Sequence, residues 1–322
     1  MRRPSVARLR GFLGAGVLGA GLAAGCAPIE APQARSLIPV PAPARPASLT
    51  RIMPDPSELA AYYQRIEDER VASGLMRRDE GETPISASIL ARNYIDIALH
   101  DEYLLSAGRY RARTSPSVLR RWERPVVYRM EFGDSVPPAM RAHDHAKVAA
   151  LVSDLAGAAG HPMRLLPQGL SRGGNFHVLV LNEDERRAIG PRLEALIPGI
   201  DAAAVRLVAE MPRETFCLVL AFSRDGNATY SEAFAVIRAE HPDLTRLACY
   251  HEELAQGLGL ANDSARARPS IFNDDQEFAL LTAHDRLLLR LHYDPRLRPG
   301  MTESEARPIV FRIASELLAG ES

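Results

Sequence analysis

The sequence predicts an α+β fold for the larger, C-terminal part of a 322-residue chain. Two observations support this prediction. The chain is 46% hydrophobic and 25% charged, which is the balance of a protein that folds around a core. Short runs rich in β-branched and aromatic residues alternate with longer segments of helical periodicity. A collagenous, coiled-coil or wholly disordered protein is therefore excluded, and one globular body is expected.

Two helices are expected first. One spans residues 57–73, with Ser57 as its N-cap and Gly74 as its stop. The other spans residues 86–106, where apolar side chains recur at helical spacing. Together they form a helical preface over residues 57–110.

An alternation of strands and helices then defines a domain over residues 111–322. The expected elements are, in order, a strand over 125–132, a helix over 139–159, a strand over 176–181, a helix over 183–196, strands over 216–222 and 233–239, and a helix over 244–258 that Gly259 stops. The strand over 233–239 follows its predecessor closely enough to be its hairpin partner or an edge strand. This order predicts a mixed sheet with backing helices.

The charge balance argues against a nucleic-acid binder. Thirty-nine basic residues stand against 40 acidic ones, a formal net charge of −1. Removing residues 1–25, which contain four arginines and no acidic residue, leaves 35 against 40, a net charge of −5. A protein that neutralises phosphates needs a basic face, so no nucleic-acid partner is expected.

The N-terminal segment has the three parts of an export signal. A cationic head over residues 1–10 is followed by an apolar run over 11–24 and by small residues that end at Cys26. The run is too short and glycine-rich for a transmembrane helix. Leu22-Ala23-Ala24-Gly25-Cys26 resembles a bacterial lipobox, in which the cysteine is acylated and becomes the first residue of the mature protein. The alternative is an ordinary signal peptide with a chance cysteine.

The resemblance implies a lipoprotein signal peptide over residues 1–25 and a membrane partner held through the lipid, such as palmitate, at Cys26. Ala27, which is not aspartate, then favours the outer membrane over the inner one. Residues 26–56 hold eight prolines and few large apolar side chains, so this segment is expected to be an extended tether. The expected location is the cell envelope, facing the periplasm.

Two cysteines remain once Cys26 carries lipid. In an oxidising compartment the economical interpretation is one disulfide between Cys217 and Cys249. The alternative is two buried free thiols, because spacing alone does not bring two Cα atoms within bonding reach.

The segment from Cys249 to Ser264 is the most informative one for function. In zincin peptidases, His-Glu-x-x-His places two imidazoles on one helical face to bind zinc, and its Glu is the general base. A glycine then turns the chain toward a third ligand. Anchored on Gly259, this spacing puts Glu252 and Gln256 in the histidine positions, Glu253 in the catalytic position and Asn262 in the third position.

The other register of the motif begins at His251, and its fourth following residue is Ala255, which cannot bind a metal. Neither register supplies two imidazoles. The helical segment 244–259 is therefore similar to a zincin helix without its histidines.

Downstream segments extend the resemblance. Ser270-Ile271-Phe272-Asn273 stands where metzincins have their Met-turn, and residues 281–293 resemble their closing helix. Residues 213–301 resemble the bacterial secreted proteins that carry domain of unknown function 2927, and the likeness continues more loosely back to residue 85. This resemblance implies a zincin-like fold and no established activity.

These observations favour a binding or scaffolding module, a pseudo-peptidase that needs no cofactor and whose partner is an envelope protein or polymer. On this view Glu253 and Gln256 form a buried hydrogen-bond network with the turn at residues 262–264. The alternative is a metal-dependent hydrolase, in which Glu253 activates water on a divalent ion bound by Glu252 and by Asn262 or Asp263. Such oxygen ligands suit hard cations better than zinc.

Overall fold

The protein is described by a computed structural model. It describes residues 56–78, 84–106, 109–170, 172–224, 227–273 and 275–320, which lie in one compact unit over Met53–Ser322. The predicted signal peptide, Cys26 and almost all of the tether fall outside the described residues. In the described part of the chain, no helix combines the length and the apolar character needed to cross a membrane.

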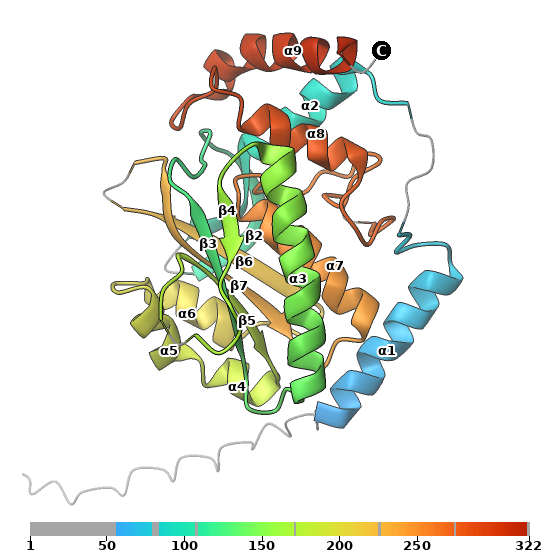
Figure 1. The fold of residues 1–322 in the computed structure, drawn as a ribbon, viewed down its shortest axis with the longest axis vertical. Helices are drawn as coiled ribbons and strands as arrows, with labels where there is room; N and C mark the ends of the chain where they lie inside the picture. The colour runs from blue at the N-terminus through green and yellow to red at the C-terminus, as the bar shows by residue number, and fades with distance from the viewer. Residues whose placement is uncertain are drawn as a thin grey trace, which may run out of the picture. The chain divides into compact units, whose positions relative to one another are not determined.

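A five-stranded mixed sheet lies at the centre of this unit (Figure 1). Its strands are β3 (Val126–Phe132), β4 (Met163–Leu165), β5 (Phe176–Leu181), β6 (Cys217–Ser223) and β7 (Tyr230–Arg238), in the order β4-β3-β5-β7-β6. The first four in this order are parallel to one another, and β6 runs antiparallel to β7 at the edge. The structure confirms the predicted α+β class and the hairpin pairing of the last two strands.

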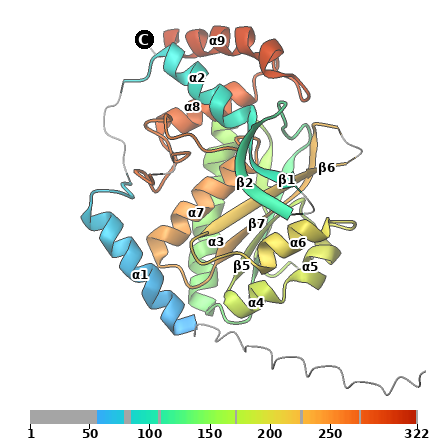
Figure 2. The same cartoon turned by 180° about the vertical axis from the view of Figure 1, so that it is seen from behind.

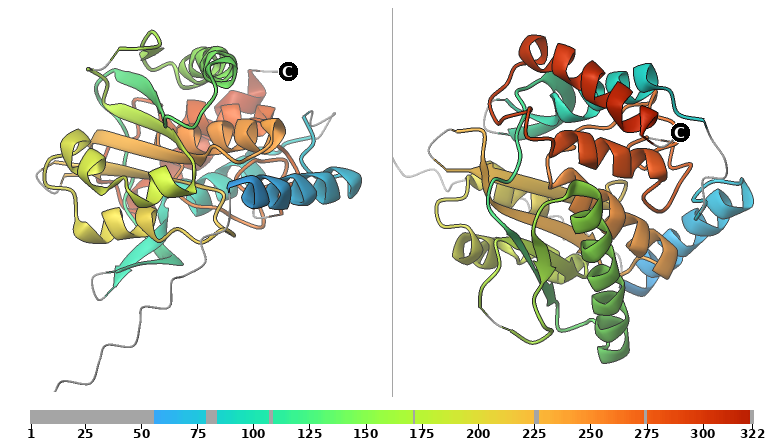
Figure 3. Two further views of the ribbon diagram at one scale, coloured as in Figure 1. Left: turned by 90° about the horizontal axis from the view of Figure 1, so that it is seen from below. Right: turned by 45° about the horizontal axis from the view of Figure 1, so that its top comes forward.

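Helices cover both faces of the sheet, as the two views of Figure 3 show. One face packs against α3 (Pro138–Ala159), α7 (Asp243–Gln256) and α8 (Ala283–His292), and the other against α5 (Gly190–Leu196) and α6 (Ala202–Ala209). Strand β5 shows the two-residue alternation that this requires, because Val178 and Val180 enter the larger core while Leu179 and Leu181 enter the smaller one.

The helical preface is shorter than predicted. Helix α1 spans Pro56–Ala72 and α2 spans Ala87–Ala98, but residues 100–106 form strand β1 (His100–Ser106), paired with β2 (Arg109–Pro116). The prediction of a helix to Ser106 is therefore wrong beyond Ala98. The antiparallel partner strand satisfies backbone groups that a longer helix would have bonded internally.

A second correction concerns residues 183–196. The predicted single helix is two short ones, α4 (Glu183–Arg187) and α5, because Pro191 lacks the N–H that a continuous helix would use and its ring clashes with the preceding turn. Helix α6, helix α9 (Glu303–Ala319) and the short strand β4 were not predicted. Helix α9 lies beside α2 (Figure 1).

Helix α1 is attached to the body by specific contacts. Glu67 accepts hydrogen bonds from the backbone nitrogen and the hydroxyl of Thr245, both at 2.7 Å, at the start of α7. The hydroxyl of Tyr63 donates to the carbonyl of Arg213 at 3.0 Å, just before β6. Helix α1 therefore contacts α7, which carries the motif, and the segment just before β6.

Candidate functional site

A cleft of about 350 Å³ lies between the β1–β2 hairpin, the edge strand β6 and the C-terminal end of α7. Figure 2 shows the hairpin beside β6, on the side of the sheet away from the viewer in Figure 1. The residues that line the cleft include Glu102 and Tyr103 of β1, Tyr110 of β2, Val219–Phe222 of β6, and Gln256 and Gly257 at the end of α7. The end of the degenerate motif therefore forms part of the cleft wall.

Glu253, in the position of the catalytic glutamate, is a buried carboxyl. The residue is 4% exposed, and its Oε2 atom has no hydrogen-bond partner among the residues that the structure describes. Burial raises its pKa well above the usual range, and the neighbouring carboxylates of Glu252, Glu102 and Asp263 raise it further. Burial therefore favours the protonated form of this carboxyl.

Gln256 links α7 to the following turn. Its Nε2 donates to Oδ1 of Asp263 at 3.0 Å, which is the contact to the turn that the binding-module interpretation predicts for Gln256, whereas Oε2 of Glu253 has no such partner among the described residues. Asn262 is tied into the same turn. Its Nδ2 donates to the carbonyls of Asp96 and Asp263, at 2.9 and 2.7 Å, and its Oδ1 accepts from the hydroxyl of Thr114 at 3.2 Å.

Glu252 lines a different and smaller cavity, about 30 Å³ in volume, next to the two half-cystines. His251, which starts the other register of the motif, accepts a hydrogen bond at Nδ1 from the backbone nitrogen of Leu281 at 3.1 Å. Burial lowers the pKa of His251 to about 4, so the imidazole is neutral at pH 7. Among the residues that the sequence motif predicts to form the site, Gln256 and Asp263 are hydrogen-bonded to each other. Glu252 faces the small cavity beside the disulfide, and His251 contacts the backbone of Leu281.

The cleft residues do not fit a metal centre. Among the described residues, the group of three potential ligands whose ligand atoms lie within 4.8 Å of one another is His143, Asp144 and Asp243, away from the cleft. Asp144 is already held by Arg246, at 2.7 and 2.9 Å. At the cleft, Gln256 directs its amide nitrogen, a donor, toward Asp263, and Asn262 uses both ends of its amide within the protein.

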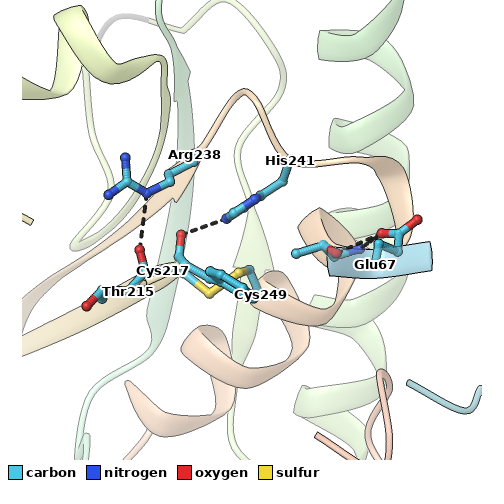
Figure 4. Close-up of a disulfide and its surroundings, with 8 residues drawn as sticks. Glu67, Thr215, Cys217, Arg238, His241 and Cys249 are labelled. Carbon is cyan, nitrogen blue, oxygen red and sulfur yellow. Dashed lines mark hydrogen bonds between the residues drawn. A yellow bond between two sulfur atoms is a disulfide. The ribbon is translucent and has the colours of Figure 1, made fainter. Parts of the chain in front are cut away.

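The predicted disulfide is confirmed. Cys217 of β6 and Cys249 of α7 are bonded, with their Cα atoms 5.9 Å apart, and the alternative of two free thiols is wrong. Figure 4 shows this bond close to Arg238 and His241, which donate to the carbonyls of Thr215 and Phe216 at 3.1 and 2.8 Å. The edge strand and the motif helix are thus joined covalently.

The hairpin residues of the cleft were missed by the sequence analysis. The β1–β2 pairing shifts register between Asp101 and Tyr103, at Glu102. Such bulges redirect side chains and are frequent beside functional sites. Burial and the charge of Glu102 raise the pKa of Tyr103. The available signal was Gly108, a turn residue between two runs of strand-forming character.

Gly259 occupies the turn where the motif requires a glycine. Its φ is +125°, and a Cβ atom there would lie 2.2 Å from Nε2 of His292 and 2.3 Å from the carbonyl oxygen of Arg120. His292 is buried, and its ring nitrogens lie 2.9 Å from the hydroxyl of Tyr94 and 3.1 Å from the Arg120 carbonyl. Only a glycine allows this close approach.

The segment that follows the turn is fixed by Asp285 of α8. Its carboxylate accepts from the hydroxyl of Ser270 at 2.5 Å and from the backbone nitrogens of Ile271 and Thr282, at 3.1 and 2.9 Å. Phe272 is fully buried. The loop after the motif is therefore an ordered part of the core.

A comparison with known protein families gives a match over most of the chain. A family model described as "Protein of unknown function (DUF2927)" matches residues 87–312. The curated proteins include none that matches the sequence. The matched region contains the hairpin, the whole sheet, the motif helix and the loop that Asp285 fixes.

Proposed function

Because the chain belongs to the DUF2927 family of proteins of unknown function, we propose a function from its own cleft: a lipid-anchored envelope protein whose zincin-like domain binds a partner and does not cleave it. One observation carries this proposal. The positions of the first two metal ligands hold Glu252 and Gln256, so neither supplies an imidazole for zinc, and Glu253 in the general-base position is buried with its pKa raised. Burial favours the protonated form of the Glu253 carboxyl, and that form cannot take a proton from water.

The zincin-like interpretation is supported by the order of the parts along the chain. Helix α7 follows a mixed sheet, the turn at Gly259 follows α7, and the buried segment at residues 270–273 precedes the closing helix α8. These are the parts that the resemblance implies, in the same sequence. The ligand positions differ from those of a zinc peptidase, which is why we propose a pseudo-peptidase.

The partner that suits this cleft is an extended segment of an envelope protein. Within the described part of the chain, β6 pairs with β7 along one edge and has no strand partner along the other, and Val219–Phe222 of β6 line the cleft. An open strand edge presents backbone N–H and C=O groups that can pair with an added strand. Tyr103 and Tyr110 of the opposite wall offer aromatic area to its side chains.

The proposal of a lipid anchor is based on the sequence. Residues 1–26 have the order of a lipoprotein signal, and the proline-rich segment that follows supplies a tether between Cys26 and α1. We propose that the folded unit faces the periplasm from the outer membrane.

A display screen with a random peptide library on the immobilised full chain tests binding at the cleft. Selected peptides are then measured against Ala221→Arg, which places a large side chain in the cleft wall, and against Ala150→Arg on the exposed surface of α3. We expect Ala221→Arg to abolish binding and Ala150→Arg to leave it unchanged. Equal binding by both variants would remove the cleft from the proposal.

The hydrolase alternative has one observation in its favour. A carboxyl of perturbed pKa beside other carboxylates, close to a cleft, is a pattern found in active sites. Three results together would establish this alternative. The purified protein would hydrolyse peptides, it would contain one equivalent of a divalent ion, and a folded Glu253→Gln variant would be inactive. The binding proposal predicts no turnover by either protein.

A further inference from the structure

A second cavity, outside the cleft, lies where α2, α9 and the loop at residues 266–268 meet. Its volume is about 560 Å³, within the range of sites that hold small molecules. Four arginines and one aspartate line it, which gives the lining a formal charge of +3. These residues are Arg92 of α2, Arg266 and Arg268 of the loop, Arg307 of α9, and Asp96 of α2. We call it the arginine cavity; Figure 1 shows α2 and α9 side by side at this end of the molecule.

The fold creates this concentration of positive charge. The four arginines come from three segments that are far apart in the sequence, in a chain whose formal net charge is −1. A concave wall with an excess of one sign of charge focuses the local potential and raises the local concentration of ions of the opposite sign. The arginine cavity is therefore electrostatically suited to an anion.

Most of the arginines already have carboxylate partners, but the pairs are exposed. Arg266 lies 2.6 Å from Asp96, Arg268 pairs with Asp275 and Glu277, and Arg307 pairs with Glu303. The three arginine side chains are 79%, 57% and 49% exposed, respectively. Exposed pairs contribute little stability, so a ligand can replace them at small cost.

Arg92 differs from the other three arginines. It is exposed, and it forms no ion pair with any residue in the part of the chain that the structure describes. Its neighbour Asn93, in the same lining, is buried and holds its amide 3.2 Å from His284. Arg92 thus brings a positive charge without a carboxylate partner to the cavity wall, next to Asn93, whose amide is already held by His284.

We propose that the arginine cavity binds a phosphate-bearing ligand with two or more negative charges. Planar guanidinium groups match pairs of phosphate oxygens, and several of them around one cavity can contact one phosphate group or two adjacent ones. Arg266, Arg268 and Arg307 already pair with protein carboxylates, so a ligand that replaces these partners needs more than one negative charge. A soluble phosphoester and the headgroup of a phospholipid share this chemistry, and the test separates them.

Inorganic pyrophosphate is the first probe, measured by calorimetry with the full chain carrying Cys26→Ser so that no acyl chain is present. The double variant Arg92→Gln/Arg307→Gln removes two lining arginines. The control Arg290→Gln/Arg312→Gln removes the same charge from exposed positions outside the cavity. We expect saturable binding that weakens by at least about tenfold in the first variant and less than about twofold in the control. Unchanged thermal unfolding of both variants shows that the fold is intact.

Vesicles that contain phosphatidic acid are the second probe, compared with phosphatidylserine vesicles of matched surface charge. Binding that prefers phosphatidic acid and is lost in the Arg92→Gln/Arg307→Gln variant identifies the ligand as a lipid headgroup. Pyrophosphate binding without vesicle binding identifies a soluble ligand. Absence of binding to both probes, or equal weakening in the two double variants, would overturn the proposal.

Discussion

Glu253 couples the stability of the protein to pH. In the unfolded chain its carboxyl ionises near the ordinary value of 4.5, whereas burial and three carboxylate neighbours raise its pKa well above that in the folded protein. Folding therefore retains a proton that the unfolded chain releases. Its contribution to stability is fully present below about pH 4.5 and declines as the pH rises toward the folded-state pKa.

The variant Glu253→Gln cannot ionise and should lack this decline. We expect the free energy of unfolding of the wild type to fall relative to that of Glu253→Gln, by up to about 1.4 kcal/mol per pH unit above pH 5. Urea unfolding between pH 5 and 8 measures the difference. The exposed Glu194→Gln is the matched control, and parallel curves for wild type and Glu253→Gln would contradict the assignment of a retained proton.

Gly259 allows a test of the turn that follows the motif. Gly259→Ala combines an unfavourable φ of +125° with contacts of 2.2 and 2.3 Å, whereas Gly199→Ala has a φ of +84° and nothing within 4 Å of the added atom. We expect Gly259→Ala to lower the free energy of unfolding by about 3 kcal/mol and Gly199→Ala by about 1 kcal/mol. A similar loss in both variants would mean that His292 and Arg120 move away freely.

For the secondary-structure elements, the sequence pattern predicts a segment correctly where it fits one type of element much better than the other. The run at residues 216–222 is continuously apolar, and a strand is the structure that such a short run favours; β6 lies there, although at the edge of the sheet and mostly half-buried, not buried as the run predicts. The segment at residues 99–106 was ambiguous, because its apolar residues fit a helix as well as a strand. Its partner strand decided the outcome, and pairing between strands is a tertiary property that single-segment periodicity does not contain.

The candidate site also combines features that local sequence predicts with features that arise only from the tertiary structure. The spacing of Gly259 from Glu252 and Gln256 located the motif helix and the turn, because these residues are close in sequence. Glu102 and Tyr103 lie about 150 positions earlier and reach the cleft only through the fold. The burial of Glu253 and the charge of Glu102 that raises its pKa are products of the fold, so the raised pKa could not be predicted from the sequence.

The disulfide between β6 and α7 should contribute strongly to stability. It closes a loop of 32 residues, for which the loss of entropy in the unfolded chain amounts to about 3 to 4 kcal/mol. We expect the double variant Cys217→Ser/Cys249→Ser to lose this much free energy of unfolding. Unfolding of the wild type with and without reductant provides the control, since reductant should destabilise the wild type and leave the double variant unchanged.

For the whole molecule, the anchor at Cys26 makes a prediction about partitioning. If Cys26 carries lipid, the wild type should enter the detergent phase and Cys26→Ser should remain aqueous or unprocessed, because the acyl chains supply the apolar surface that is transferred. Phase separation followed by immunoblotting of the two proteins measures this. Equal distribution of both would show that the membrane is not reached through Cys26.

The covalent link between the edge strand and the motif helix also affects the energetics of any association at the cleft. The disulfide joins β6, which forms one wall of the cleft, to α7, whose C-terminal end also lines it. These two elements therefore cannot separate when the cleft is empty. The receptor side is preorganised, and the entropy lost on binding falls mainly on the incoming segment. Affinity should therefore rise most in ligands whose backbone is already held extended, for example by cyclisation through a second strand.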